Sequence, residues 1–292
     1  ELNDFTFNGN PQKWIAVART LQARIALNWA EVDGSGAYQK ALNYAQEGIS
    51  ETSGAGNWKP LHKSGSDGEE SMWYQFFNEN FNDIMSFGGA GLLLVDLMKK
   101  DNDGRLDLYF AKSIYNQGNY VTYNDSIVGL APYDTLPPPY PSHLNQNTFG
   151  SDEWGIEWIS WYENQFIIAE CQYGLGQQED ALLTLNNTLA TIEYNWQQID
   201  SACTIPRYID IYGSEIIEAI INEKYKAMFL NMQVLSDWRR TGYPLFTDRR
   251  GNSTECMGGI PRRLPYPDLE KSANSNSPVG DSIYDRVEND PN

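Results

Sequence analysis

The sequence has few of the residues from which catalytic and metal centres are usually built. It contains only two histidines, His62 and His143, and both lie in loop-like sequence, so a Ser/His/Asp triad or a histidine-rich metal site has little to draw on. Its three cysteines are far apart and form no CxxC pair, which removes the zinc-ribbon and thioredoxin interpretations. We therefore expect no catalytic residues, no metal and no cofactor.

Basic residues and long apolar runs are also scarce. Lys and Arg number 21 against 39 Asp and Glu, which gives a formal net charge of -18. Because binding to a phosphate backbone needs a Lys/Arg surface, this balance argues against nucleic acid and favours an uncharged or cationic ligand. No stretch approaches the roughly eighteen apolar residues that a membrane span requires, and the residues after Glu1 show no export signal.

The cysteines leave one question open. Cys171 falls within a helical pattern and is expected to be a small core residue. Cys203 and Cys256 lie in loop-like sequence and can either pair in an oxidising compartment or remain free, because spacing alone does not decide between the two.

Helical periodicity dominates what is present. Asn10 followed by Pro11 predicts an N-cap with proline at the first helical position, and Ser214 is a second expected N-cap. The tryptophans at 154, 158 and 161 have helical spacing and are expected to be core. The segment 113–152 shows no sustained period and is predicted to be a long irregular excursion. The apolar spacing predicts helices over 11–28, 38–49, 89–100, 154–169, 181–196 and 214–232.

Two segments invite other interpretations. The run 101–107 alternates carboxylates, but Arg105 and Leu106 stand where the EF-hand template wants an acid or Asn and then glycine, so a capped helix terminus explains it better than calcium. Carboxylate pairs such as Glu69-Glu70 are expected to be solvated surface in a chain with 39 acids.

The joint at 169–189 resembles a tetratricopeptide unit, with Ala169-Glu170, then Leu175-Gly176, then Ala181-Leu182. Such a unit consists of two antiparallel helices that pack through small residues where they cross. Because no regular 34-residue recurrence is present, degenerate repeats with inserted loops fit better than a tandem solenoid.

Several segments, in order, resemble the SusD/RagB family and in particular its SusD-like subgroup. The less specific pieces are 4–10 with Lys13-Trp14, 18–24, 166–170, and 102–106, where Gly104 stands in place of the usual proline. The most specific are 220–225, 237–244 and 260–267, followed by Glu270 and Asn274. Physically, Asp237 with Arg239 and Arg240 can close an ion-pair network at a helix end, Gly242 is a left-handed stop, and the prolines near Tyr266 stiffen a strap with that ring as a buried anchor.

The resemblance implies a mostly α fold of degenerate tetratricopeptide-like helix pairs with long irregular loops, over a single domain 1–292 that matches the C-terminal two-thirds of a longer chain. Within it we expect a helix pair (1–50), a loop-rich ligand-binding insertion (51–152), tetratricopeptide-like helices (153–246), and a C-terminal strap and tail (247–292).

The resemblance also implies a function. It is that of a non-enzymatic lipoprotein at the bacterial cell surface, anchored in the outer membrane through an N-terminal lipid absent from this chain. Such a protein caps a SusC-like TonB-dependent transporter and captures oligosaccharide or peptide. A tetratricopeptide-like protein scaffold and, less favoured, a helical glycoside hydrolase are the alternatives.

Aromatic residues on loops are the candidate ligand site. Flat rings flanked by Asn and Gln suit a sugar face or an extended peptide, since a ring gives apolar area at little entropy cost. The candidates are Trp58, Trp73, Tyr74, Phe76, Asn78, Tyr120, Tyr123, Tyr133 and Tyr140.

Overall fold

The computed structural model describes residues 3–65, 68–75, 91–112, 114–117, 120–123, 127, 142–245, 262–264, 266–277 and 284–285, with backbone only for 114–117 and 120–123. Its elements in chain order are α1 (Pro11–Leu27), α2 (Ala30–Asp33), α3 (Ser35–Gln46), α4 (Met72–Tyr74), α5 (Leu92–Lys100), α6 (Arg105–Tyr109), β1 (Ile114–Gln117), β2 (Tyr120–Tyr123), α7 (Trp161–Gly174), α8 (Gln178–Gln197), α9 (Ser214–Ala227), α10 (Gln233–Thr241) and α11 (Asp268–Ala273). The mostly helical class expected from the sequence is confirmed.

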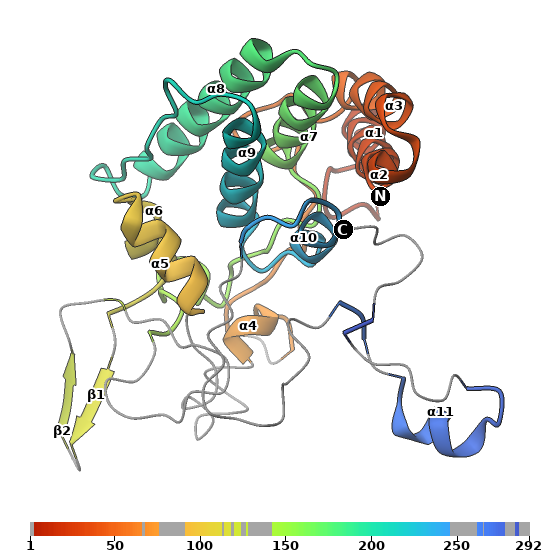
Figure 1. Cartoon of the computed structure of the whole chain (residues 1–292). Coiled ribbons are helices and arrows are strands. Elements are labelled where there is room, and N and C mark those ends of the chain that lie inside the picture. The colour runs from red at the N-terminus through yellow and green to blue at the C-terminus, as the bar shows by residue number, and fades with distance from the viewer. Residues whose placement is uncertain are drawn as a thin grey trace.

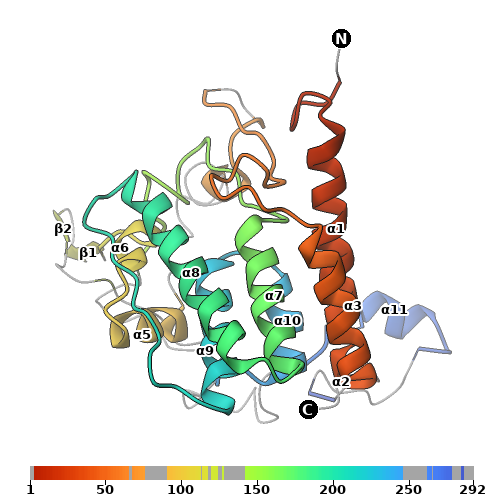
Figure 2. The same ribbon diagram turned by 90° about the horizontal axis from the view of Figure 1, so that it is seen from above.

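The long helices pack around α7. In Figures 1 and 2, α1 and α3 lie side by side at one end, α7 lies next to them, and α8 and α9 both pack against α7. The expected tetratricopeptide-like joint is therefore the α7–α8 pair. Gly174 ends α7 against α3, where an added Cβ would lie 2.5 Å from Cε2 of Tyr38. A side chain at this crossing would separate the two helices.

Local capping explains where the most firmly predicted helix begins. The Asn10 side chain accepts hydrogen bonds from the Gln12 and Lys13 backbone N–H groups, and Pro11 occupies the first turn, as predicted. For α9 the prediction was off by one residue, because Gly213, at φ 57°, is the N-cap and Ser214 already belongs to the helix. This helix also ends at Ala227, well before residue 232.

Other expectations need correction. The helix predicted over 154–169 begins only at Trp161, so Trp154 and Trp158 lie in extended chain and the three tryptophans form no helical core stripe. The excursion 113–152 is not wholly irregular, because β1 and β2 pair as an antiparallel hairpin. Tyr266 is half-buried beneath Arg263, with the guanidinium 5.3 Å from the ring centroid, so it is not a buried anchor.

Two groups of charged side chains are buried between helices. In the first, the α6–α9 cluster, the Arg105 Nη2 donates to Glu223 at 2.6 Å and its Nε donates to Asp103 at 2.9 Å. Lys226 pairs with Asp101 at 2.9 Å and also with Glu223. The Asp101 and Asp103 carboxylates thus face protein cations, and Asp103 also accepts from the Arg105 backbone N–H as α6 starts, which agrees with the capped terminus expected there.

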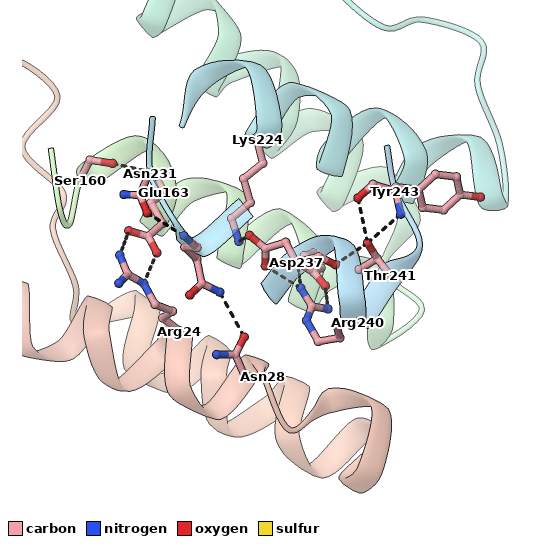
Figure 3. Close-up of polar contacts among 12 residues, drawn as sticks. Arg24, Asn28, Ser160, Glu163, Lys224, Asn231, Asp237, Arg240, Thr241 and Tyr243 are labelled. Carbon is pink, nitrogen blue, oxygen red and sulfur yellow. Dashed lines mark hydrogen bonds and ion pairs between the residues drawn. The ribbon is translucent and has the colours of Figure 1, made fainter. Parts of the chain in front are cut away.

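The second group, the α9–α10 cluster, joins Lys224 to Asp237 at 2.8 Å and Asp237 to Arg240 at 3.0 Å (Figure 3). Arg240 also pairs with Glu170 of α7. Gly242 then ends α10 in the left-handed conformation, φ 75°. The predicted ion-pair network at this helix end is confirmed for Asp237 and Arg240, and the predicted glycine stop is confirmed at Gly242.

The two described cysteines are buried with free thiols. Burial raises the pKa of Cys203 to about 11, and Cys171 lies in the core as expected. Cys256 lies outside the described residues. Among the helices that the structure describes, none combines the length and apolar character needed to cross a bilayer.

Candidate functional site

An open groove of about 790 Å³ lies where the chain segments around α4, 156–158 and the start of α10 meet. Tryptophan and methionine side chains form its apolar walls, and amide, hydroxyl and basic groups stand among them. We call it the tryptophan groove. Its lining residues are Arg24, Pro60, His62, Ser71, Met72, Trp73, Ile156, Glu157, Trp158, Leu230, Asn231, Met232, Gln233 and Ser236.

Trp158 is the exposed ring of this groove, with 48% of its surface accessible. The Trp58 ring meets it at right angles, 89° between planes and 4.9 Å between centroids. Their backbones are also bonded, because Trp158 N–H donates to Trp58 O at 2.8 Å and Trp58 N–H donates to Ile159 O at 2.8 Å. Trp158 is therefore an aromatic surface that is held in place before any ligand arrives.

The carbonyls next to this ring are fixed by the side chains of Arg24 and Asn231, which Figure 3 shows. Arg24 of α1 donates from Nη2 to Trp158 O at 2.6 Å and to the Glu163 carboxylate at 2.6 Å. Glu163 is fully buried at the start of α7, so the guanidinium is anchored. From the other side, Asn231 donates from Nδ2 to Glu157 O at 3.0 Å. The extended segment is thus clamped between α1 and the α9–α10 link.

A second, smaller hollow lies on the other side of residue 157. We call it the aromatic pocket, with a volume of about 150 Å³. Trp154 and Trp196 stack in it with planes 8° apart and centroids 5.9 Å apart. The Glu157 carboxylate accepts from Tyr162 OH at 3.1 Å. Burial, and then the nearby Glu157, raise the pKa of Tyr162 well above its ordinary value.

The sequence profile of one protein family, described as starch-binding and associating with the outer membrane, matches residues 2–267. The chain belongs to this SusD-like family. The resemblance identified from the sequence is therefore confirmed. No curated protein matches the chain.

Solved structures show the same SusD-like fold. A structure named as a chitin-binding protein has a TM-score of 0.69 at 19% identity, over 99% of this chain and 67% of that one. A SusD homologue from Bacteroides fragilis has a TM-score of 0.67 at 18% identity, over 93% of this chain and 64% of that one. For a homologue from Bacteroides vulgatus the TM-score is 0.69 at 19% identity, over 92% and 59%. The chain spans about two-thirds of the length of these relatives.

The predicted ligand residues of this SusD-like chain fall in different places, and only some of them lie at the tryptophan groove. Trp73 lines the tryptophan groove, and Trp58 supports it from behind Trp158. Tyr74 is half-buried in the last position of α4 and does not line the groove. Tyr120 and Tyr123 lie on β2, where only the backbone is described. Phe76, Asn78, Tyr133 and Tyr140 lie outside the described residues, so their part in a site stays a prediction.

Sequence reasoning missed Trp158 and Arg24. One signal was available for the first, because Ser160 and Glu163 have the S-x-x-E spacing of a capping box, which starts a helix at Trp161 and leaves Trp158 outside it. Ser160 Oγ indeed accepts from the Glu163 backbone N–H at 3.2 Å. Arg24 ends the family-like segment 18–24, but no local pattern indicated its partners, which it reaches across the fold.

Proposed function

We propose that this chain is a cell-surface glycan-binding protein of the bacterial outer membrane. In this proposal it captures oligosaccharide and delivers it to a SusC-like TonB-dependent transporter. The observation that carries the ligand class is Trp158, a half-exposed indole held rigidly in an open groove. Family membership supports the membrane association, since the family is described as starch-binding and associating with the outer membrane.

The chemistry of the groove suits a sugar chain. An indole face stacks on the C–H face of a pyranose, while amides and hydroxyls satisfy its hydroxyl groups. Asn231 and Gln233 are both in the groove lining, and each is already oriented by a protein contact, Gln233 through Nε2 to Asn28 Oδ1 at 3.2 Å. A site that is ordered in advance loses little conformational entropy on binding.

The groove is better suited to binding than to hydrolysis. Glycoside hydrolysis uses two carboxyl groups that flank the scissile bond. Among the described residues that line the groove, Glu157 alone carries a carboxylate. We therefore propose capture of the glycan without turnover, and the chitin-binding name of one fold relative is in keeping with a glycan ligand.

The test compares Trp158→Ala with Trp29→Ala on a panel of oligosaccharides and peptides. Trp29 is a matched control because it is also 48% exposed but lies outside the groove. Loss of a central aromatic contact costs about 2 kcal/mol or more, so W158A should weaken glycan binding roughly thirtyfold. W29A should bind as the unaltered protein does, and Trp73→Ala should weaken binding in the same direction as W158A.

Other outcomes separate the alternatives. If W158A bound glycans with full affinity, the groove would not be the ligand site. If the protein bound peptides and no oligosaccharide, the ligand would not be a glycan. If it bound only other proteins, the scaffold alternative would be favoured. Release of shortened sugars during the titration would reject a purely binding role. For the partner and the proposed lipid anchor, the full-length protein should copurify with a large β-barrel from outer membranes, and its absence there would reject the transporter complex.

A further inference from the structure

We propose that the aromatic pocket binds a protonated amino group carried on a sugar ring, so that the glycan taken by this protein includes unacetylated amino sugar. This inference rests on the proposed function, because it names the ligand class of a glycan-binding site. The observations that support it concern the aromatic pocket and not the tryptophan groove, so the two proposals can be tested separately.

The size of the pocket admits one ring. Its volume is about 150 Å³, and a closed protein cavity of that volume holds one benzene ring, so the pocket has no room for two rings. Its mouth lies beside Ser53 and Ile199, which are exposed. A single pyranose unit, or the end of a chain, is therefore the occupant that fits, and a longer segment is not.

The walls of the pocket are electron-rich. Trp154 and Trp196 stack on one another, and Phe149 meets Trp154 with centroids 5.3 Å apart. Trp161 and Tyr162 also line the pocket, with centroids 5.9 Å apart. The faces of such rings carry partial negative charge and attract an ammonium group within about 6 Å of the centroid.

A carboxylate without a cation stands in this pocket. Glu157 accepts a hydrogen bond from Tyr162 OH, and its Oε1 lies 3.5 Å from the Asn57 amide nitrogen. Among the described residues, Glu157 has no ion-pair partner, and no Lys, Arg or His lines the pocket. The tryptophan groove differs, because Arg24 and His62 line it. An incoming ammonium would supply the missing positive charge.

Glu157 also connects the two hollows. Its backbone carbonyl accepts from Asn231 beside the tryptophan groove, and its residue lines both hollows. The aromatic pocket and the tryptophan groove are therefore neighbouring hollows that share one residue. The formal charge of -18 on the chain adds a long-range attraction for a cationic sugar over a neutral or anionic one.

The experiment titrates the unaltered protein with glucosamine, N-acetylglucosamine and glucose at slightly acidic pH, where the amine carries its proton. The three sugars differ only at the C2 substituent: glucose is the neutral sugar of matched size, and N-acetylglucosamine is neutral and larger by an acetyl group. Glucosamine should bind about tenfold more tightly than either neutral sugar, a difference of about 1.4 kcal/mol. Equal affinity for the three sugars would overturn the proposal without any variant being needed.

Variants then locate the effect. Glu157→Gln keeps the shape and removes the charge, so the preference for glucosamine should disappear. Glu153→Gln, an exposed acid four positions earlier, should retain it. Retained preference in E157Q would overturn the assignment to this carboxylate. W29A, outside both hollows, should keep the glucosamine preference. The groove is tested with oligosaccharides and W158A and this pocket with single sugars and E157Q, so a failure of either proposal gives a different result.

Discussion

Replacing Arg105 by methionine would remove the guanidinium from the α6–α9 cluster and keep most of the side-chain volume. Four side chains of the cluster are buried, and all but the first of them fully so: Asp103, Arg105, Glu223 and Lys226. In the variant, two buried carboxylates would share the single ammonium of Lys226. Breaking a buried pair by removing one partner is strongly destabilising, because it leaves charge without compensation in a medium of low polarity.

The magnitude follows from the burial. A broken buried pair costs about 3–5 kcal/mol. With an unfolding entropy of about 2.1 cal/mol/K per residue over 292 residues, 1 kcal/mol corresponds to a fall of about 1.6 °C in Tm. R105M should therefore melt about 5–8 °C below the unaltered protein. Burial would lower the pKa of Arg105, but Glu223 and Asp103 raise it well above its ordinary value, so the lost charge is a full one.

The assay is thermal unfolding followed by circular dichroism, with Arg19→Met as the control. Arg19 pairs with Glu47 at 2.8 Å, but both side chains are exposed, 36% and 63%. An exposed pair of this kind contributes about 0–1 kcal/mol, so R19M should shift Tm by less than about 2 °C. If R105M lowered Tm no more than R19M does, the argument that this buried cluster requires its arginine would be wrong.

Two further changes test other parts of the fold. Burial would raise the pKa of Asp237, but Lys224 holds it below 3.8, so its stabilisation is present above pH 3.8 and is lost as the pH falls further. At neutral pH the Asp237→Asn variant should unfold at a lower urea concentration than the unaltered protein. Below pH 3.8 it should lose less stability than the unaltered protein does. Equal loss of stability in the two proteins below pH 3.8 would contradict this. Gly174→Ala should lower the free energy of unfolding by about 1–3 kcal/mol, because the added methyl group would meet the Tyr38 ring. Gly36→Ala is the control, since open space surrounds Gly36 and the change should not destabilise the protein. Equal melting temperatures of the two variants would contradict the close packing at Gly174.

The helices whose ends are set locally could be predicted from the sequence. For α1, a capping asparagine and a proline at the first turn lie next to one another, and the apolar stripe follows at once. The end of α9 depends on distant contacts instead. The apolar pattern continues through Met228, but the chain turns at Leu230, with φ 66°, and Asn231 donates to Glu157 O from a sequence distance of 74 residues. Periodicity cannot report such a contact.

Only part of the predicted ligand set lies at the proposed groove. Trp73 lines the groove and Trp58 packs against Trp158, while the role of these aromatic residues in ligand binding stays a prediction. Helical spacing from Trp154 predicts Trp158 in the core, whereas the cap at Ser160 starts α7 after Trp158 and leaves that ring outside the helix. Where a periodic pattern and a capping signal disagree, the cap decides, because it satisfies backbone N–H groups that periodicity leaves unpaired.

Arg24 shows why the rest of the site was beyond sequence reasoning. Its partners Trp158 and Glu163 are 134 and 139 residues away, and an arginine on a periodic helix has no local feature that distinguishes it from a solvated one. What distinguishes it is a fully buried carboxylate on α7, which would be costly to bury without a cation. The Arg24–Glu163 pair therefore ties α1 to α7, and the same guanidinium fixes the backbone carbonyl of Trp158. The position of the proposed ligand surface is thus a consequence of how the core neutralises a buried charge.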